Sequence, residues 1–580
     1  RPTPVGPCSM NNTLRYVLFA LAGAVLVYYV ALRKPDRPNA GRLAQENPPA
    51  ATTNRAAERT FRVLTPSSGN VGALEAVLSS HSAAVRDLWM TGGQFQHASA
   101  HIDPRTEQPT QDRRLNLSTT YREELLPLRV QLRLRRGETS VMPDYADFEG
   151  QQVNEREVAF TWRGNDVEVV RTYRGERPFV MRVETRVTNR GAPVTVEHAL
   201  PLYHWATRTE EAGKFFQRPW QLAEAMCHHG GELYREGRDN LLERRGDALF
   251  PGNARFVGVG NLYFVSALVP QGNAEVRCRL FAEDRPNSES AVGSVYAGAL
   301  AWPRATLEQG ATETFTASAF FGPKDEAVLA RAIDDGRLKD TVNLGFFSFI
   351  ARQLVRFLRF LHGITGNWGT AIILLTLTIR VALLPLLAKS MRSMAMMQKV
   401  KPELDEINKK FADNNEAKTL ATMELYKKHG INPLSGCLPQ LAQLPVWWAL
   451  YTTLQTSVEL FHAPFYGWIR DLSAPDPVYL LPLVLGGIMF VQQKLMPPQG
   501  MDPTQAKMMT YFFPIFLTGI SLFLPAGLAL YMLINSLLGI LQQWYTKVQM
   551  DKMKTEGAGT GGGQAIVVRP IASGGSRGND

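Results

Sequence analysis

Hydrophobic and polar positions divide the chain into two kinds of segment. Residues 434–458, 477–493 and 508–546 contain no Asp, Glu, Lys or Arg, whereas residues from about 60 to 340 repeatedly alternate apolar and polar side chains. A bilayer core about 30 Å thick needs about 20 helical residues, so the charge-poor stretches predict membrane spans. Alternation with a period of two predicts strands that have one face in water.

Six transmembrane helices are expected from the charge-poor stretches. They are an uncleaved anchor within 13–34 and spans at 369–388, 434–454, 477–496, 508–524 and 526–545. The last two come from 39 uncharged residues, which would form about 58 Å of helix, or two crossings. The sequence Leu524-Pro525-Ala526-Gly527 supplies the turn between them.

The Lys and Arg residues of the short loops predict the orientation. Residues 389–433 contain nine of them, whereas residues 457–476 contain only Arg470. Because cytoplasmic loops carry the excess of Lys and Arg, the first loop is expected inside and the second outside. Alternation then places both termini in the cytoplasm and residues 35–365 on the outer side.

The external segment is expected to fold as a large antiparallel β-sandwich over 59–340, after a Pro- and Ala-rich linker at 35–58. In 179–187 the odd positions are mostly apolar and the charges fall on even ones. Cys227 and Cys278 lie in this oxidising compartment, and the sequence leaves their pairing open. His228 and His229 lack a second ligand pair, so a turn is expected there rather than a metal site.

An amphipathic helix is predicted at 344–362, between the sandwich and the second span. It places Arg352, Arg356 and Arg359 on one face, and we expect these arginines to seat the helix on the outer membrane surface. Packing of the helix on the sandwich is the alternative.

The cytoplasmic segment 389–432 predicts a two-helix hairpin. Apolar residues from Met397 to Phe411 recur at spacings of three and four, and the pattern resumes at Leu420, Met423 and Tyr426. We expect Lys399, Lys401, Lys409 and Lys410 to contact a ribosome or a targeting factor. A merely solvated surface is the alternative.

Arg380 lies near the middle of the second span. A charge at this depth costs about 2.5 to 3.5 kcal/mol on insertion scales, and none of the six spans contains an Asp or Glu. Water is therefore the expected compensation, in a cavity open to the cytoplasm. Its expected polar lining is Thr376, Gln440, Gln443, Asn535 and Ser536. The alternative is an arginine held by backbone carbonyls or a lipid phosphate.

Several function classes lack support in the sequence. The net charge of +10 is not gathered into a basic block with aromatics, so a direct role in nucleic-acid binding is set aside. The chain contains no nucleophile elbow, Walker loop, HExxH or CxxC motif, so no catalytic residue, metal or cofactor is expected. A secondary transporter or channel remains the alternative function, and a carbohydrate enzyme with a membrane anchor is a third.

Several motifs occur in order along these spans. They are Gly366-Asn367-Trp368-Gly369, Arg380 with Pro385, Asn432-Pro433-Leu434-Ser435-Gly436-Cys437-Leu438-Pro439, Asp471-Leu472-Ser473, and Pro525-Ala526-Gly527-Leu528 with Tyr531. With this topology, the chain resembles the YidC membrane protein insertases in their long Gram-negative form. Residues 1–12 have no match to the family.

The resemblance implies a multi-pass helical protein of the bacterial inner membrane with a periplasmic β-supersandwich. It implies a five-helix insertase core at 366–546, with Arg380, Thr376 and Tyr531 in a hydrophilic groove open to the cytoplasm. The implied partners are nascent membrane protein clients, the Sec translocon, ribosomes with targeting factors, and membrane lipids. Within the Gly-rich cytoplasmic tail at 547–580, residues 557–580 are only sparsely basic, which argues against strong ribosome binding through the tail.

Overall fold

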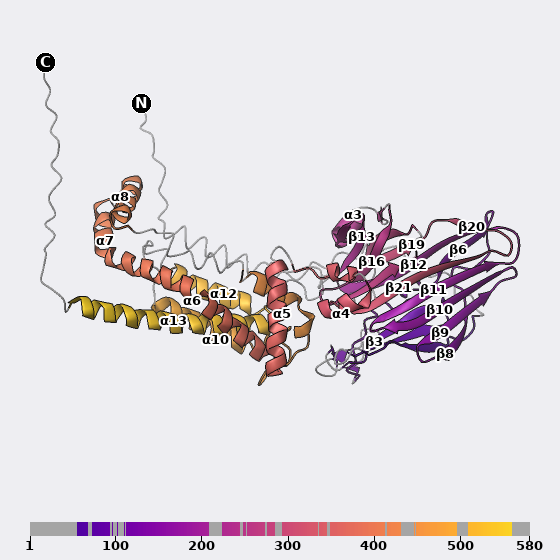
Figure 1. Cartoon of the computed structure of the whole chain (residues 1–580), viewed down its shortest axis with the longest axis horizontal. Coiled ribbons are helices and arrows are strands. Elements are labelled where there is room, and N and C mark those ends of the chain that lie inside the picture. Colours follow the sequence, from indigo (N-terminus) through magenta and orange to yellow (C-terminus); the bar gives the residue numbers. More distant parts are fainter. Residues whose placement is uncertain are drawn as a thin grey trace, which may run out of the picture. The chain divides into compact units, whose positions relative to one another are not determined.

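The computed structural model divides the chain into two compact units, with the boundary between Val342 and Asn343 (Figure 1). The structure describes residues 55–67, 72–92, 95–96, 101–102, 109–110, 112–207, 223–243, 248–250, 252–272, 275–284, 293–334, 336–344, 348–411, 414–430, 446, 448–495 and 508–558. The expected first span and most of the third lie outside these residues.

The first unit contains two large antiparallel sheets. The nine-stranded sheet has the order β14 (Glu232–Glu236), β13 (Glu224–His229), β16 (Ala254–Gly260), β17 (Phe264–Pro270), β21 (Thr312–Pro323), β11 (Val180–Asn189), β10 (Val167–Arg177), β9 (Glu157–Arg163) and β8 (Glu149–Asn154). The seven-stranded sheet comprises β15 (Ala248–Phe250), β18 (Arg277–Asp284), β19 (Gly293–Ala301), β12 (Val194–Thr207), β6 (Gln131–Arg136) and β7 (Thr139–Ser140), with β20 (Ala305–Leu307) paired to β12.

Smaller elements complete this unit. They are a sheet of β1 (Thr60–Leu64), β2 (Leu74–Ser79) and β3 (Ala84–Met90), the pair β4 (His101–Ile102) and β5 (Pro109–Thr110), and the helices η3 (Glu123–Leu125), α3 (Arg238–Glu243), α4 (Glu326–Ala332) and η4 (Arg337–Thr341). Strands β13, β16 and β17 pack face to face on β12, β18 and β19, so the two large sheets form a sandwich.

The period-two pattern explains how the strands bury one face. In β11, Met181, Val183, Thr185 and Val187 are buried, and Arg182 and Arg186 between them are exposed. The expected strand began at Phe179, but this residue has a positive φ of 63° and forms the turn before β11. The predicted alternation is therefore confirmed from Val180 onward.

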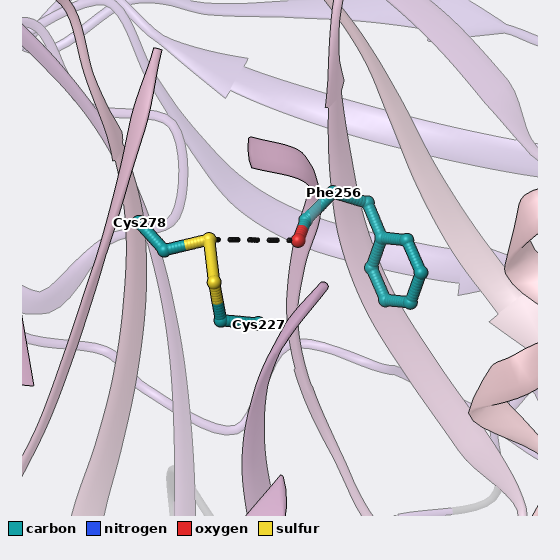
Figure 2. Close-up of a disulfide and its surroundings, with 3 residues drawn as sticks. All are labelled: Cys227, Phe256 and Cys278. Atoms are coloured by element: carbon teal, nitrogen blue, oxygen red, sulfur yellow. Dashed lines mark hydrogen bonds between the residues drawn. A yellow bond between two sulfur atoms is a disulfide. The ribbon is translucent and has the colours of Figure 1, made fainter. Parts of the chain in front are cut away.

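A disulfide joins the two large sheets. Cys227 on β13 and Cys278 on β18 are bonded, with Cα atoms 6.1 Å apart, and Figure 2 shows the bond beside Phe256. Cys278 Sγ also lies 3.6 Å from the Phe256 carbonyl oxygen. The expectation of a turn at the neighbouring histidines is wrong, because His228 and His229 end β13 and the turn follows at Gly230 and Gly231.

A polar network crosses the interior of the sandwich. The fully buried Arg171 on β10 donates to the Leu128 carbonyl oxygen over 2.7 Å and to Thr185 Oγ1 on the neighbouring strand. His198 Nε2, on β12 of the other sheet, lies 3.3 Å from the same Thr185 hydroxyl. Burial, together with the positive charge of Arg171, lowers the pKa of His198 to about 3.

The second unit is helical. Its elements are α5 (Ser348–Thr365), α6 (Trp368–Lys399), α7 (Lys401–Lys410), α8 (Asn415–Lys428), a helix at 448–456, η5 (Val458–Leu460), α10 (Leu480–Leu495), the π-helical turn η6 (Met508–Phe512), α12 (Phe513–Ser521) and α13 (Ala526–Ala558). Within this unit, Figure 1 shows α5 lying across one end of the helices, while α7 and α8 lie at the far end of α6.

Several helix boundaries differ from the expected ones. Helix α6 continues to Lys399, eleven residues into the segment assigned to the hairpin, and α13 continues to Ala558, twelve residues into the assigned tail. Both extensions consist largely of helix-forming polar or Met residues that a helix in water accommodates. The interfacial helix begins and ends later than expected.

One helix in the described part of the chain, Ala526–Tyr545, is long and apolar enough to cross a membrane. Shorter apolar helices occur at Trp368–Leu384, Leu480–Leu495 and Thr510–Ser521. The fifth expected span is divided between η6 and α12, with the turn at 522–525.

We expect the sandwich to lose stability as the pH falls below about 6.5. Burial, together with Lys324, also lowers the pKa of His204 to about 4. Because these folded-state pKa values lie below the unfolded value of about 6.5, the neutral histidines contribute stability above that pH, and the contribution is lost as the pH falls toward 4 and 3. At pH 5 the loss is about 2 kcal/mol for each histidine.

Urea unfolding of the full chain, followed by β-sheet circular dichroism at pH 7 and pH 5, measures this loss. A variant with His198→Gln and His204→Gln should lose less stability between the two pH values than the parent. An equal loss in both proteins would contradict the assignment to these histidines.

Candidate functional site

Arg380 on α6 is held by polar atoms of α13. Its Nε donates to Asn535 Oδ1 and its Nη2 to the Asn535 backbone oxygen, each over 2.8 Å. Its Nη1 donates to Gln542 Oε1 over 3.3 Å. Asn535 and Gln542 are seven residues apart, or about two helical turns, so they share one face of α13. The contact therefore joins two long helices through a single guanidinium group.

The partners of Arg380 are all neutral. A guanidinium carries five N–H donors, and three of them make these hydrogen bonds. The other two N–H groups have no partner in the described part of the chain, and no carboxylate there pairs with Arg380. The positive charge is therefore held in place without being neutralised by these contacts.

Gly539 lies between the guanidinium and a polar side chain of a third helix. A Cβ placed on Gly539 of α13 would lie 2.7 Å from Gln492 Nε2 and 3.6 Å from Arg380 Nη2. Gln492 belongs to α10, so three helices bring polar groups to this position. A side chain at residue 539 would push against the Gln492 amide.

Other expected residues lie near this cluster on the same helices. Thr376 is one turn before Arg380 on α6, is 2% exposed, and donates to the Ile372 carbonyl oxygen over 2.7 Å. Tyr531 is one turn before Asn535 on α13 and is buried, as is Ser536. The Thr376 hydroxyl is thus used within its own helix.

The loop at 457–476 packs across one end of these helices. The backbone N–H groups of Ala526 and Gly527 donate to the carbonyl oxygens of Ala474 and Leu472 over 2.7 and 2.9 Å. At the start of α6, a Cβ on Gly369 would lie 2.0 Å from the Phe465 ring, so only glycine permits this approach. The loop therefore contacts the first turns of both α6 and α13.

An ion pair ties α5 to this loop. Arg359 donates through Nε to Glu459 Oε1 over 2.8 Å, and its Nη2 contacts the same oxygen. The Glu459 side chain is 6% exposed and that of Arg359 is 27% exposed. Arg359 therefore faces the helices, whereas Arg352 and Arg356 are exposed.

Two family models match the chain. The model described as 60Kd inner membrane protein matches residues 360–554, and the model of the YidC periplasmic domain matches residues 115–357. Together they cover the strands of the sandwich from β6 onward and the helical unit almost completely.

Relatives of known name extend these matches. A membrane protein insertase YidC from Anaeromyxobacter dehalogenans is 38% identical over 415 residues, which cover 69% of this chain and 71% of the relative. The chain belongs to the YidC family of membrane protein insertases. The YidC of another Anaeromyxobacter strain is 35% identical over 491 residues, or 82% of this chain and 83% of the relative.

Two solved YidC structures also align with the chain. The first, titled as an active YidC insertase with its first transmembrane domain resolved, covers 92% of this chain and 99% of its own at 18% identity and a TM-score of 0.35. The second, YidC from Thermotoga maritima, covers 84% of this chain and 99% of its own at 14% identity and a TM-score of 0.29. The family assignment rests on the sequence relatives.

The structure of this YidC family member brings only some of the expected site residues together. Asn535 contacts Arg380, and Thr376, Tyr531 and Ser536 lie within about one turn of that contact along their helices. Gln440 and Gln443 lie outside the described residues. Lys399 and Lys401 lie in α6 and α7, and Lys409 and Lys410 are exposed on α7.

Gln492, Gln542 and Glu459 are not among the site residues predicted from the sequence. A signal for Gln542 was present, because Asn535, Gly539 and Gln542 recur at i, i+4 and i+7 on an otherwise apolar helix. Water was the expected compensation for Arg380, whereas the structure adds amide and backbone oxygens from α13. The alternative of a carbonyl-bound arginine was therefore partly right.

We expect Arg359→Ala to destabilise the helical unit by about 3 kcal/mol, because it leaves the buried Glu459 carboxylate without this cation. Arg356→Ala, one turn earlier and exposed, is the matched control and should change stability by less than about 0.5 kcal/mol. Thermal unfolding of the purified full chain in detergent measures both. Equal effects of the two variants would show that the Arg359–Glu459 pair does not stabilise the unit.

Proposed function

We propose that this chain inserts newly made polypeptides into the bacterial inner membrane through a hydrated, cytoplasm-facing groove that contains Arg380. Membrane protein insertion is its function as a member of the YidC family, and the groove is the proposed means. Insertion by this route uses no catalytic residue, metal or cofactor.

The hydrogen bonds of Arg380 support this proposal most strongly. Neutral oxygens of Asn535 and Gln542 fix the guanidinium while leaving its charge and two N–H groups unpaired among the described residues. A cation in this state attracts an acidic or carbonyl-rich segment of a client, because charge-assisted hydrogen bonds are about twice as strong as neutral ones. A carboxylate partner would have cancelled that attraction.

The contacts of the 457–476 loop at one end of the helices support a groove that is open at the opposite end only. The 457–476 loop is bonded to the first turn of α13 and packed against Gly369 at the start of α6. With the Lys-rich α6–α8 region in the cytoplasm, this loop lies on the periplasmic side. The groove is then open to the cytoplasm and closed to the periplasm.

A client can supply the driving force itself. Each Leu or Ile that enters lipid gains roughly 0.3 to 0.6 kcal/mol, so an apolar client helix offsets the cost of moving its polar end. The proposed topology has six spans, cytoplasmic termini and the β-sandwich in the periplasm. Insertion then needs no nucleotide.

The hairpin of α7 and α8 is the proposed contact for ribosomes, targeting factors or the Sec translocon. Val400 and Leu425 form its buried contact, with Leu404, Ile407 and Tyr426 around them. Leu420 and Met423 are each 65% exposed, although their spacing suggested that they would pack in the hairpin. Together with Lys409 and Lys410, they give α7 and α8 an exposed surface that is both apolar and basic.

We expect Arg380→Ala to reduce insertion of a client with an acidic translocated tail about tenfold, because a charge-assisted contact is worth about 1.5 to 3 kcal/mol. Insertion of the same client with a neutral tail should change much less. The assay is protease protection of a newly made single-span client added to proteoliposomes that contain the purified chain.

Empty liposomes and Arg356→Ala, which alters an exposed arginine of α5, are the controls. Equal losses for acidic and neutral tails would rule out a role for the charge. Solute or ion flux without client insertion would instead favour the transporter or channel alternative.

A further inference from the structure

A buried polar segment lies at the end of the helix 448–456, outside the Arg380 cluster. The nine residues from Thr452 to Leu460 are all buried. Six of the nine are polar or charged, and each of these is at most 6% exposed: Thr452, Thr453, Gln455, Thr456, Ser457 and Glu459. We call residues 452–459 the polar turn. Polar side chains buried in membrane domains are costly and usually serve a function.

Two hydroxyls of the polar turn have no hydrogen-bond partner among the described residues. They are Thr453 Oγ1 and Ser457 Oγ, and both atoms are buried. Other helical threonines of this unit avoid this state by donating to the carbonyl four residues earlier. Thr376, Thr378, Thr456 and Thr518 do so over 2.7 to 2.8 Å. Thr453 makes no such bond, although its hydroxyl is buried.

The two residues lie on consecutive turns. They are four positions apart, and the Ser457 backbone N–H donates to the Thr453 carbonyl oxygen over 2.9 Å, so their side chains leave the backbone on the same side. Buried hydroxyls in native proteins are almost always satisfied by protein groups or by bound water. Two such hydroxyls on neighbouring turns therefore indicate a polar partner with its own donors and acceptors, which is water or a polar group of a bound segment.

The polar turn belongs to the same packed core as the Arg380 helices. Leu450 and Leu454 lie in one hydrophobic cluster with Leu375 of α6 and Tyr531 of α13. Thr453 and Ser457 precede Glu459 in the chain, and Glu459 forms an ion pair with Arg359. Ser457 is also the first residue of the 457–476 loop. The two residues thus lie, along the chain, between residues that pack with the Arg380 helices and the loop that covers one end of them.

We propose that Thr453 and Ser457 form a second polar binding position of the insertase, which holds water and then the polar groups of a client segment that has passed Arg380. The proposal rests on the insertase function proposed above. Hydroxyls both donate and accept but carry no charge, so this position suits the uncharged peptide groups and side chains of a translocated tail. It matters only for tails long enough to reach beyond Arg380.

The test is a double variant, Thr453→Val with Ser457→Ala, in the full chain. Both changes nearly keep the side-chain volume and remove only the hydroxyls. Thr378→Val is the matched control, because its hydroxyl bonds its own helix and its side chain is exposed. Two single-span clients, identical except for a short or a long uncharged polar tail, are inserted into proteoliposomes and scored by protease protection.

We expect the double variant to lower insertion of the long-tailed client about fivefold and to leave the short-tailed client unchanged, since one hydrogen bond contributes a factor of about this size. Its thermal unfolding temperature should be equal to or above that of the parent, because removing unsatisfied buried hydroxyls does not destabilise a protein. A loss of insertion in a stable variant therefore cannot come from unfolding.

Unchanged insertion of both clients by the stable variant would overturn the proposal and leave the insertase function intact. An equal loss for both clients would also overturn it, because the effect would not depend on tail length. If the parent protein inserts neither client, the proposed function fails, and this inference fails with it.

Discussion

The helical unit depends on keeping one charged guanidinium among apolar helices. The cost of burying a charge is offset here by neutral oxygens, two from Asn535 and one from Gln542. This arrangement links α6 to α13, and Gly539 lies beside it next to the Gln492 amide of α10. It also keeps the charge free to act on something else, which a buried ion pair would prevent.

The two ends of the helical unit are built differently. At one end, backbone hydrogen bonds, a close glycine contact and the Arg359–Glu459 pair hold the 457–476 loop against α5, α6 and α13. At the other end, α6 and α13 extend as polar helices beyond their apolar parts, and α6 leads to α7 and α8. In the proposed groove, a polar segment that enters from the cytoplasmic side would meet Arg380 before it reached the end that the loop covers.

The sandwich keeps its own polar interior for a structural reason. Arg171, Thr185 and His198 bond across the two sheets, and the disulfide joins β13 to β18 at another point. The lowered pKa values of His198 and His204 follow from this burial. Among the described residues, no group of three or more His, Cys, Asp or Glu side chains could hold a metal ion.

Features with a regular period could be predicted from the sequence, whereas single long-range contacts could not. The alternation in β11 and the position of Arg380 in an apolar helix are local patterns, and both were read correctly. The predicted ends of α6 and α13 were wrong, because Lys, Gln and Met residues are good helix formers and do not mark where a helix stops. The Arg359–Glu459 pair joins residues 100 positions apart, and no local pattern reports such a contact. The pairing of Cys227 with Cys278 was open for the same reason, since it depends on which strands face each other across the sandwich.

Cysteine labelling measures whether water reaches the Arg380 cluster from the cytoplasmic side. Gln542→Cys places a thiol beside the guanidinium, and Leu541→Cys places one on the neighbouring position, whose side chain is 59% exposed on the outside of the unit. Both are made with Cys8 and Cys437 replaced, in vesicles of known orientation. A membrane-impermeant maleimide should label Gln542→Cys from the cytoplasmic side only, and should leave Leu541→Cys unlabelled because lipid covers it. A Gln542→Cys thiol that is as unreactive as the Leu541→Cys thiol, or one that is labelled from the periplasmic side, would show that no water-filled groove connects Arg380 to the cytoplasm.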